Sequence, residues 1–398
     1  VTRKNLLNFI YDTIERGLIG KTDDRVCSLT SPAFDIFGYE AIATLCSGSS
    51  LYICSSLEQL DAKKVGEKIV KYQLNHILGS VSRLRAFAEN KEFTLALTNL
   101  KYILAGGETF PISFLNFLKA HTNAKIFNLY GPTETTIWST VKELTNEDTV
   151  SIGKAIANTS LYITNKNGNI LPRGAWGELC IAGDGVAEGY IENEEGTLKH
   201  FVPNNELQDL VVYKTGDRCR MLSDGEIELS GRFDHQVKVH GCRVELSEIE
   251  KVVLQYPDVS HAVALVEKND VNDQLVLFYT GTKDSEKRIK NYIAKTLPTY
   301  MIVDKIIFLD EMPLNINGKT DRLALQHKLS SKDNVQYVQE NQAGQLSRNV
   351  TSSDILDIWS NILHDHTLTK DDNFFEVGGN SYSLMLVANK MSDLLGET

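Results

Sequence analysis

The sequence predicts an α/β fold. Through its first third, apolar runs of strand length alternate with amphipathic helical patterns, and these runs carry few polar residues, as strands buried on both faces of a parallel sheet do. Beyond residue 140 the pattern changes to short strands separated by Gly, Asn and Asp turns, which indicates a β-rich part. A length of 398 residues favours two or three domains over a single core.

The expected strands of the first two regions follow from these patterns. In residues 1–140, buried parallel strands are expected between helices at SLYICS (50–55), HILGSV (76–81), KYILAG (101–106) and KIFNLY (125–130). In residues 141–230, the expected strands of a small barrel or a distorted sheet are SLYITN, GELCIAG, VVYKTGD and GEIELSG.

From Val237 to about Leu329 the pattern is mixed again. There we expect, in order, the strand VKVHG, the helix ELSEIEKVVLQYP, the strand pair HAVALVEK and QLVLFYT, the helix SEKRIKNYIAKTLP and the strand KIIFLD. Residues 330–350 are polar and aperiodic, which indicates a linker. A further helix is expected to begin at a cap formed by Ser352 or Ser353, and another helix after the sequence GGNS.

Composition restricts the class of protein. The chain is 42% hydrophobic and 23% charged, as globular proteins are, and its net charge of −11 argues against nucleic acid as the main partner. No apolar run approaches the length of a membrane span, and the first residues have no signal-peptide pattern, so no membrane partner is expected. The six cysteines show no metal-binding spacing and fit a reducing cytoplasm, where they act as small hydrophobic residues.

One nine-residue run, NLYGPTETT (128–136), points to a specific kind of site. It combines an aromatic ring (Tyr130), a Gly-Pro turn, several hydroxyls and one carboxylate (Glu134) in a single bend. A buried strand has no use for that combination, whereas a site that holds a nucleotide base, a phosphate and a metal ion does.

Nine motifs occur in a fixed order along the chain, and together they resemble an adenylation domain of a nonribosomal peptide synthetase followed by the start of its peptidyl carrier domain. Each motif alone is weak, but nine in the family's order are very specific. They are FDIF (34–37), AGGE (105–108), NLYGPTETT (128–136), GELCIAGDGVAEGY (177–190), YKTGDRCR (213–220), GRFDHQVKVHGCRVELSEIE (231–250), LPTYM (297–301), NINGKTDR (315–322) and DNFFEVGGNSYS (372–383).

The resemblance implies the adenylate-forming fold. This fold is a layered α/β core subdomain with a small β-barrel, then a mobile α+β C-terminal subdomain, followed here by a partial four-helix carrier domain. The expected boundaries are 1–234 for the core, with its β-rich part at about 141–232, then 235–329, a linker at 330–350 and the carrier at 351–398. The family's phosphate loop is expected upstream of a segment like Val1–Phe9, and the carrier is expected to continue past the helix that follows GGNS.

Enzymes of this family join an amino-acid carboxylate to the α-phosphate of ATP, release pyrophosphate and pass the acyl group to a carrier thiol. The resemblance therefore implies an ATP-dependent, AMP-forming ligase, with ATP or AMP, Mg²⁺ and a 4′-phosphopantetheine arm as cofactors. The implied partners are an amino acid, a carrier domain in cis, neighbouring modules such as condensation or thioesterase domains, and a phosphopantetheinyl transferase.

The resemblance assigns catalytic roles to three residues. Glu134 is expected to bind Mg²⁺, because hard cations prefer carboxylate and phosphate oxygens. Thr133 is expected to contact the α-phosphate. Lys319, in NGKTDR, is expected to bridge the substrate carboxylate and the α-phosphate, where it adds positive charge as negative charge develops.

Further nucleotide contacts are implied on other motifs. Tyr130 is expected to stack on adenine. Asp217 is expected to accept hydrogen bonds from both ribose hydroxyls, and Arg232 is expected to be a second contact to ribose and phosphate. The backbone near Gly106 and Gly107 is expected to lie along the adenine, where Cβ atoms would obstruct it.

Asp35, in FDIF, resembles the residue that pairs with the α-ammonium group of the amino acid, and a buried carboxylate needs such a partner. The pocket positions that follow by the same resemblance are all uncharged, so a small or medium neutral side chain is favoured, with cysteine, alanine or glycine as candidates. These positions are Ile36, Tyr39, Leu78, Ile103, Ala105, Leu129, Ile137 and Trp138.

The resemblance assigns one residue to the movement between subdomains and another to acyl transfer. Asp234 resembles the hinge about which the C-terminal subdomain turns between the two half-reactions. Ser381 resembles the serine to which phosphopantetheine is attached.

Two alternatives stay open. One is another adenylate-forming ligase, such as an acyl- or aryl-CoA synthetase or a D-alanine–carrier ligase, against which Asp35 and Ser381 both count. The other is a truncated, non-catalytic docking module, against which the presence of Glu134, Asp217 and Lys319 counts.

Overall fold

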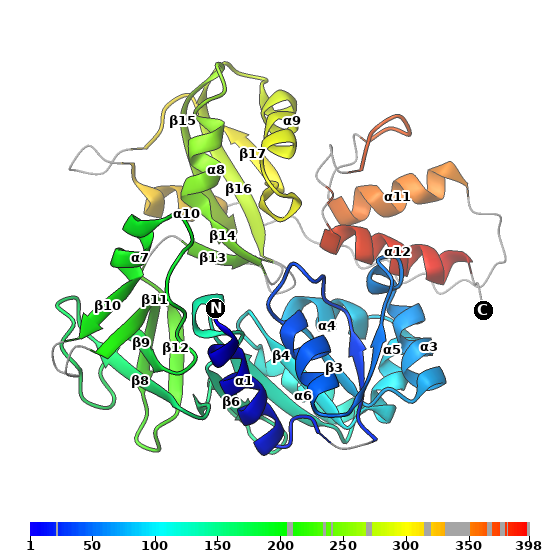
Figure 1. Cartoon of the computed structure of the whole chain (residues 1–398). Coiled ribbons are helices and arrows are strands. Elements are labelled where there is room, and N and C mark those ends of the chain that lie inside the picture. Colours follow the sequence, from blue (N-terminus) through cyan, green and yellow to red (C-terminus); the bar gives the residue numbers. More distant parts are fainter. Residues whose placement is uncertain are drawn as a thin grey trace. The chain divides into compact units, whose positions relative to one another are not determined.

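The computed structural model describes residues 1–20, 23–204, 210–233, 236–239, 242–267, 273–313, 320–330, 351–363, 368–374, 379 and 381–395. The chain divides into two compact units, Val1–Asp234 and His235–Thr398 (Figure 1). No helix within the described ranges is long and apolar enough to cross a membrane.

A seven-stranded sheet forms the centre of the first unit. Its strand order is β2-β1-β3-β4-β5-β6-β7. The first five strands pair in parallel and the last two antiparallel. The strands are β1 (Arg25–Ser28), β2 (Ser50–Ile53), β3 (His76–Ser80), β4 (Tyr102–Gly106), β5 (Lys125–Tyr130), β6 (Thr140–Glu143) and β7 (Lys154–Ala155).

The four strands expected in residues 1–140 are all present, and their parallel pairing is confirmed. The expectation that all four are buried is wrong for β2. This strand is at the edge of the sheet, so Ile53 is exposed. The four-residue strand β1, which pairs with both β2 and β3, is too short to show a clear pattern in the sequence.

The structure describes seven α-helices in the first unit, of which six lie between or beside these strands and the last, α7, lies beside the β-rich part. Local capping sets where several of them begin: Thr2 and Asn5 form a capping box at the start of α1, and the Asp61 side chain accepts a hydrogen bond from the Lys64 N–H at the start of α3. They are α1 (Arg3–Glu15), α2 (Thr44–Cys46), α3 (Ala62–Tyr72), α4 (Val81–Ala88), α5 (Lys91–Ala96), α6 (Ile112–His121) and α7 (Glu194–His200).

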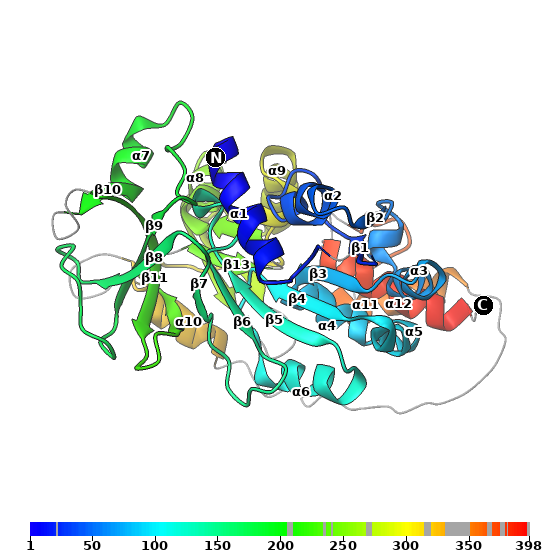
Figure 2. The ribbon, with the colours of Figure 1, turned by 60° about the horizontal axis from the view of Figure 1, so that its bottom comes forward.

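Helix α1 covers part of one face of the sheet near β5 and β6 (Figure 2). Its Phe9 and Ile10 belong to a buried apolar cluster that we call the α1-side cluster. Its other buried members are Leu18, Ile19, Val26, Tyr39, Ala43, Leu78, Tyr102, Leu104, Phe127, Leu129, Ile137, Trp138, Val141 and Ile156. The π-helical segment η1 (Gly38–Ala43) packs into the same cluster through Tyr39.

The β-rich part of the first unit is a five-stranded antiparallel sheet. Its strands are β8 (Thr159–Thr164), β9 (Gly177–Gly183), β10 (Phe201–Asn204), β11 (Leu210–Met221) and β12 (Ile227–Arg232). The order is β10-β11-β9-β8, with β12 on β11, and the register shifts twice along β11. These register shifts distort the sheet, which agrees with the small barrel or distorted sheet expected for this part of the chain.

The second unit contains a two-stranded ribbon, β13 (Gln236–Val239) and β14 (Cys242–Glu245), and a three-stranded sheet. The sheet consists of β15 (Val259–Glu267), β16 (Gln274–Gly281) and β17 (Lys305–Phe308). Helices α8 (Leu246–Val253) and α9 (Glu286–Thr296) pack on one face, and α10 (Arg322–Ser330) packs on the other (Figure 1).

The last two described helices are α11 (Ser352–Leu363) and α12 (Ser381–Leu395). Both begin where the sequence predicts a helix. The expected cap at Ser352 or Ser353 is wrong, because Thr351 is the capping residue. Its hydroxyl accepts a hydrogen bond from the Asp354 N–H, and the Asp354 carboxylate accepts one from the Thr351 N–H. This reciprocal pair is a capping box.

His76 makes the stability of the first unit depend on pH. It is completely buried at the start of β3, stacks on Tyr102, and has Nδ1 2.7 Å from Oδ1 of Asn75. Burial lowers its pKa to about 4, although the nearby Asp24 carboxylate acts in the opposite direction. An unfolded histidine titrates near pH 6.5, so protons favour the unfolded state as the pH falls from 6.5 towards 4.

We therefore expect the β3 and β4 amides to lose about 2 kcal/mol of protection between pH 7 and pH 5. His76→Phe keeps an aromatic ring but cannot titrate. The loss of amide protection between pH 7 and pH 5 should therefore be about 2 kcal/mol smaller in this variant. Hydrogen exchange measures this locally, which suits a chain of two units. An identical pH dependence in both proteins would show that His76 does not set it.

Candidate active site

The run NLYGPTETT forms a tight turn between β5 and β6. The chain leaves β5 at Tyr130, makes one 3₁₀ turn at η4 (Thr133–Thr135) and returns so that the Ser139 N–H donates to the Tyr130 carbonyl. Gly131 permits this, because a Cβ there would come within 2.4 Å of the Trp138 Cα. Ile137 has a φ of 70°, which is rare for a β-branched residue, and such strain often marks a functional site.

Tyr130, Asp217 and Arg232 come together at the junction of the two sheets of this unit. The Tyr130 hydroxyl donates to Oδ2 of Asp217, and Arg232 donates to Oδ1 at 2.5 Å. Burial and the Asp217 charge raise the pKa of Tyr130, so it stays a donor. Asp217 and Arg232 are register partners across β11 and β12, which explains why two distant motifs meet.

The carboxylate of this buried group has capacity for further hydrogen bonds. Tyr130 is 5% exposed and packs with Ile152, Ile163 and Leu179, so its ring is part of an apolar cluster. Asp217 is also 5% exposed. Each of its oxygens has two lone pairs, so the carboxylate can accept more hydrogen bonds than the two that Tyr130 and Arg232 donate.

Arg232 is expected to be important for stability as well as for binding. Arg232→Met would leave the buried Asp217 carboxylate without its cation, which should cost about 3 kcal/mol in the β11 and β12 amides by hydrogen exchange. Arg220→Met is the matched control on the same two strands, because the Arg220–Glu228 pair has side chains that are 36% exposed, and it should cost about 1 kcal/mol or less. Equal losses in the two variants would contradict this account of the buried pair.

Glu134 lies in the 3₁₀ turn and is half-buried. The Tyr190 hydroxyl donates to its Oε1 at 2.6 Å. Burial is the main reason why the pKa of Tyr190 is raised, and its hydrogen bonds to Glu134 and Tyr213 raise it further. Tyr190 therefore stays protonated. Tyr190 was not singled out in the sequence, although it ends the motif GELCIAGDGVAEGY.

The surroundings of Glu134 fit a Mg²⁺ ion that is bound mainly by a nucleotide. Within the described ranges, no group of three or more His, Cys, Asp and Glu side chains is arranged to hold a metal. Mg²⁺ in such sites takes one or two carboxylates, and phosphate and water oxygens complete its shell. A single oriented carboxylate therefore suits it.

Gly106 and Gly107 lie at the carboxyl end of β4. A Cβ on Gly106 would come within 2.6 Å of the Leu129 carbonyl oxygen on β5, and Gly107 has a φ of 81°. Both positions therefore require glycine for local reasons. This close approach of the backbone explains the AGGE sequence whether or not a base lies beside it.

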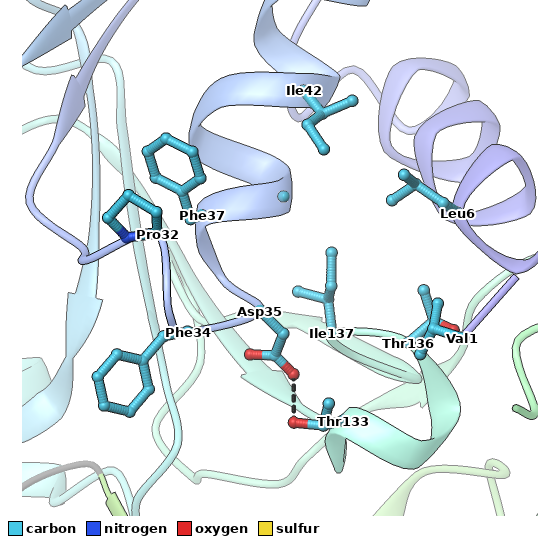
Figure 3. Close-up of a pocket in the computed structure, with 11 residues that line it drawn as sticks. Val1, Leu6, Pro32, Phe34, Asp35, Phe37, Ile42, Thr133, Thr136 and Ile137 are labelled. Carbon is cyan, nitrogen blue, oxygen red and sulfur yellow. Dashed lines mark hydrogen bonds between the residues drawn. The ribbon is translucent and has the colours of Figure 1, made fainter. Parts of the chain in front are cut away.

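Asp35 and Thr133 lie next to each other in the lining of a cavity of about 250 Å³ (Figure 3). The Thr133 hydroxyl donates to Oδ2 of Asp35 at 2.5 Å. Leu6 from α1, Phe34 and Ile137 also line the cavity, so its wall is largely apolar around one carboxylate. The contribution of α1 was not foreseen, because its pattern is that of an ordinary amphipathic helix.

Most of the expected pocket positions gather in the α1-side cluster, and Ile137 also lines this cavity. Tyr39, Leu78, Leu129, Ile137 and Trp138 belong to the α1-side cluster, and Ile36 packs against it. The Trp138 ring lies 4.5 Å from that of Phe9 and 5.2 Å from that of Tyr39, so aromatic side chains fill this space.

The structure does not bring Ile103 and Ala105 into this cluster. Leu104, between them, is in register with Leu78 and belongs to the α1-side cluster. Because successive side chains of a strand point to opposite faces, Ile103 and Ala105 face away from it. Motif spacing alone does not reveal this alternation.

Three expected functional positions cannot be placed. Lys319 and Asp234 lie outside the described residues. Ser381 is the first residue of α12, but its side chain also lies outside the described part of the chain.

Comparisons with known proteins agree with this geometry. Residues 1–191 match the family model described as AMP-binding enzyme, and residues 248–319 match that of the AMP-binding enzyme C-terminal domain. Surfactin synthase subunit 3 of Bacillus subtilis (strain 168) is 33% identical over 94% of this chain, and gramicidin S synthase 2 of Aneurinibacillus migulanus is 33% identical over 94%. The chain spans only 29% and 8% of the lengths of these two relatives.

Solved structures give the same result. A holo NRPS protein containing adenylation and PCP domains, bound to a vinylsulfonamide inhibitor, is 25% identical with a TM-score of 0.74, covering 93% of this chain and 61% of that one. A holo four-domain nonribosomal peptide synthetase bound to AMP and glycine is 28% identical with a TM-score of 0.55, covering 99% of this chain and 29% of that one. The chain therefore belongs to the AMP-binding enzyme family and has the fold of the adenylation domains of nonribosomal peptide synthetases.

Proposed function

We propose that this chain activates an amino acid with ATP as part of nonribosomal peptide synthesis. The carboxylate of the amino acid attacks the α-phosphate, pyrophosphate leaves, and an aminoacyl-adenylate forms. Its acyl group then passes to a phosphopantetheine thiol on a carrier domain, and AMP leaves. One observation supports this most: the run NLYGPTETT hydrogen-bonds to Asp217 through Tyr130 and to Asp35 through Thr133. A single turn thus joins the expected ribose and ammonium sites.

On this proposal the nucleotide lies along the turn. Asp217 and Arg232 bind the ribose, Tyr130 and the backbone at Gly106 and Gly107 lie beside the adenine, and Thr133 contacts the α-phosphate. Glu134 holds Mg²⁺, which when bound neutralises charge on the phosphates. Lys319 stabilises the charge that develops as the new bond forms.

The substrate site is proposed from Asp35 and the α1-side cluster. Asp35 accepts the α-ammonium group, which an acyl- or aryl-CoA synthetase has no need to bind. Tyr39, Trp138 and Leu129 limit the space for the side chain, so a small or medium neutral amino acid is favoured, such as cysteine, alanine or glycine.

The later steps of the proposal involve other domains. Residues 351–398 would be the start of a carrier domain modified at Ser381 by a phosphopantetheinyl transferase, and Asp234 would be the hinge between the two half-reactions. Condensation or thioesterase domains would act on the product. The chain spans only a small part of the length of its curated relatives, and these partners follow from the proposal.

ATP–pyrophosphate exchange, screened over amino acids, fatty acids and aryl acids, tests the proposal. Exchange with one or a few neutral amino acids is expected. Exchange only with acids that lack an amine would favour another adenylate-forming ligase, and no exchange with any acid would favour a docking module.

A further inference from the structure

Glu40 is a buried carboxylate that none of the roles described above uses. It lies in the π-helical segment η1, five residues after Asp35 and next to Tyr39, and it is completely buried. Four hydrogen bonds reach it from three consecutive residues just at and after the end of β1. They come from the Ser28 hydroxyl, the Leu29 N–H, the Thr30 N–H and the Thr30 hydroxyl.

The arrangement of these donors specifies a carboxylate. Oε2 accepts from the Ser28 hydroxyl at 2.7 Å and the Thr30 N–H at 3.1 Å, and Oε1 accepts from the Leu29 N–H at 3.2 Å and the Thr30 hydroxyl at 3.1 Å. Each oxygen thus faces one backbone N–H, which cannot turn away. A glutamine would place its NH₂ group against a backbone N–H in either orientation.

A buried carboxylate is not the most stabilising group that could fill this space. Burial raises the pKa of Glu40, while the four hydrogen bonds act in the opposite direction. A buried charged group of this kind is weak evidence for stability, because apolar residues of similar volume often stabilise as well or better. The four hydrogen bonds instead fix the position of η1 relative to the end of β1.

The segment that Glu40 fixes is the one that carries Asp35. A continuous series of backbone hydrogen bonds winds from Asp35 into η1: Gly38 N–H to the Asp35 carbonyl, and the N–H groups of Tyr39 and Glu40 to the Ile36 carbonyl. The residues at the end of β1 are also held in place, because Arg83 donates a hydrogen bond to the Leu29 carbonyl at 2.6 Å. A shift of Glu40 would therefore move Asp35 and Tyr39 together.

We infer that Glu40 is a positioning residue for the substrate pocket. Its hydrogen bonds fix the segment that contains Asp35 and Tyr39 to the residues at the end of β1. This inference rests on the proposed function. It requires that disturbing Glu40 affects recognition of the amino acid much more than recognition of ATP, because Asp35 and Tyr39 are residues of the proposed amino-acid site and meet the proposed nucleotide site at the Asp35–Thr133 hydrogen bond.

The test compares Glu40→Gln with a matched control in ATP–pyrophosphate exchange. The control is Asp12→Asn, because Asp12 is also a buried carboxylate of the first unit, bonded to Arg16 and to the Ala157 N–H, but is not among the residues that line the cavity. We expect Glu40→Gln to raise the KM for the amino acid about tenfold or more while the KM for ATP stays within about twofold. Asp12→Asn should lower the melting temperature without this split. Ser28→Ala, which removes one donor only, should raise the amino-acid KM less and serves if Glu40→Gln does not fold.

Two results would overturn the inference. One is an unchanged amino-acid KM in both Glu40→Gln and Ser28→Ala, and the other is an equal rise for amino acid and ATP. Both are distinct from failure of the proposed function, which would appear as a wild-type protein that supports exchange with no amino acid.

Discussion

Replacing Lys319 with alanine is expected to lower ATP–pyrophosphate exchange by roughly 100-fold or more, because removing one preorganised positive group from a developing negative charge costs 10²–10³ in rate. The loss should fall on kcat more than on either KM, since this interaction is made mainly in the transition state. Transfer of the acyl group to the carrier thiol from a preformed adenylate should be spared, because the bond to phosphate has already formed by then.

Lys295→Ala is a suitable control for this prediction. Lys295 is an exposed lysine at the end of α9 in the same unit, and its removal should leave both half-reactions unchanged. Unchanged exchange in Lys319→Ala would remove Lys319 from the catalytic assignment. Equal loss of both half-reactions would instead assign it a general structural role.

The second large effect is expected at Asp35. Asp35→Asn keeps the shape of the side chain but removes the charge that pairs with the ammonium group, which should cost about 3 kcal/mol, or roughly 100-fold in kcat/KM for the amino acid. The same variant should discriminate poorly between the amino acid and its des-amino analogue, which the wild-type protein should reject. Exchange kinetics with both acids measure the two effects.

Asp184→Asn controls for loss of an acidic residue in the same unit. Asp184 pairs with the exposed Lys4 at 2.8 Å, and such surface pairs contribute little. If Asp35→Asn retained the full preference for an ammonium group, the assignment of Asp35 would fail, and the cavity beside it would need another explanation.

The order of the elements was predictable because burial leaves a clear pattern. Strands β3, β4 and β5 are covered on both faces, so their sequences are nearly continuous apolar runs. β1 was not found because four residues are too few for a period, and the exposure of β2 follows from its place at the edge, which the sequence does not reveal. The cap at Thr351 was missed because three consecutive hydroxyl residues all suit that position.

The candidate site was predictable where one motif contains several functional groups. NLYGPTETT carries its turn, its hydroxyls and its carboxylate within nine residues, and the structure shows Thr133 and Tyr130 in contact with Asp35 and Asp217. The orientation of Ile103 and Ala105 was not predictable from spacing, because it depends on which face of β4 meets α1. Glu40 gave no signal at all, since a single glutamate in an apolar segment resembles an exposed side chain until its donors are known.

The central claim is that one cleft binds nucleotide, divalent ion and amino acid together. A crystal structure of the protein with Mg²⁺ and a non-hydrolysable aminoacyl-adenylate analogue tests it most directly. The account predicts ribose hydroxyls at Asp217, the phosphate mimic beside Thr133, the ion at Glu134 and the ammonium group at Asp35, all around one bound molecule. An analogue bound elsewhere, or Asp217 and Asp35 opening onto separate surfaces with no shared cleft, would contradict it.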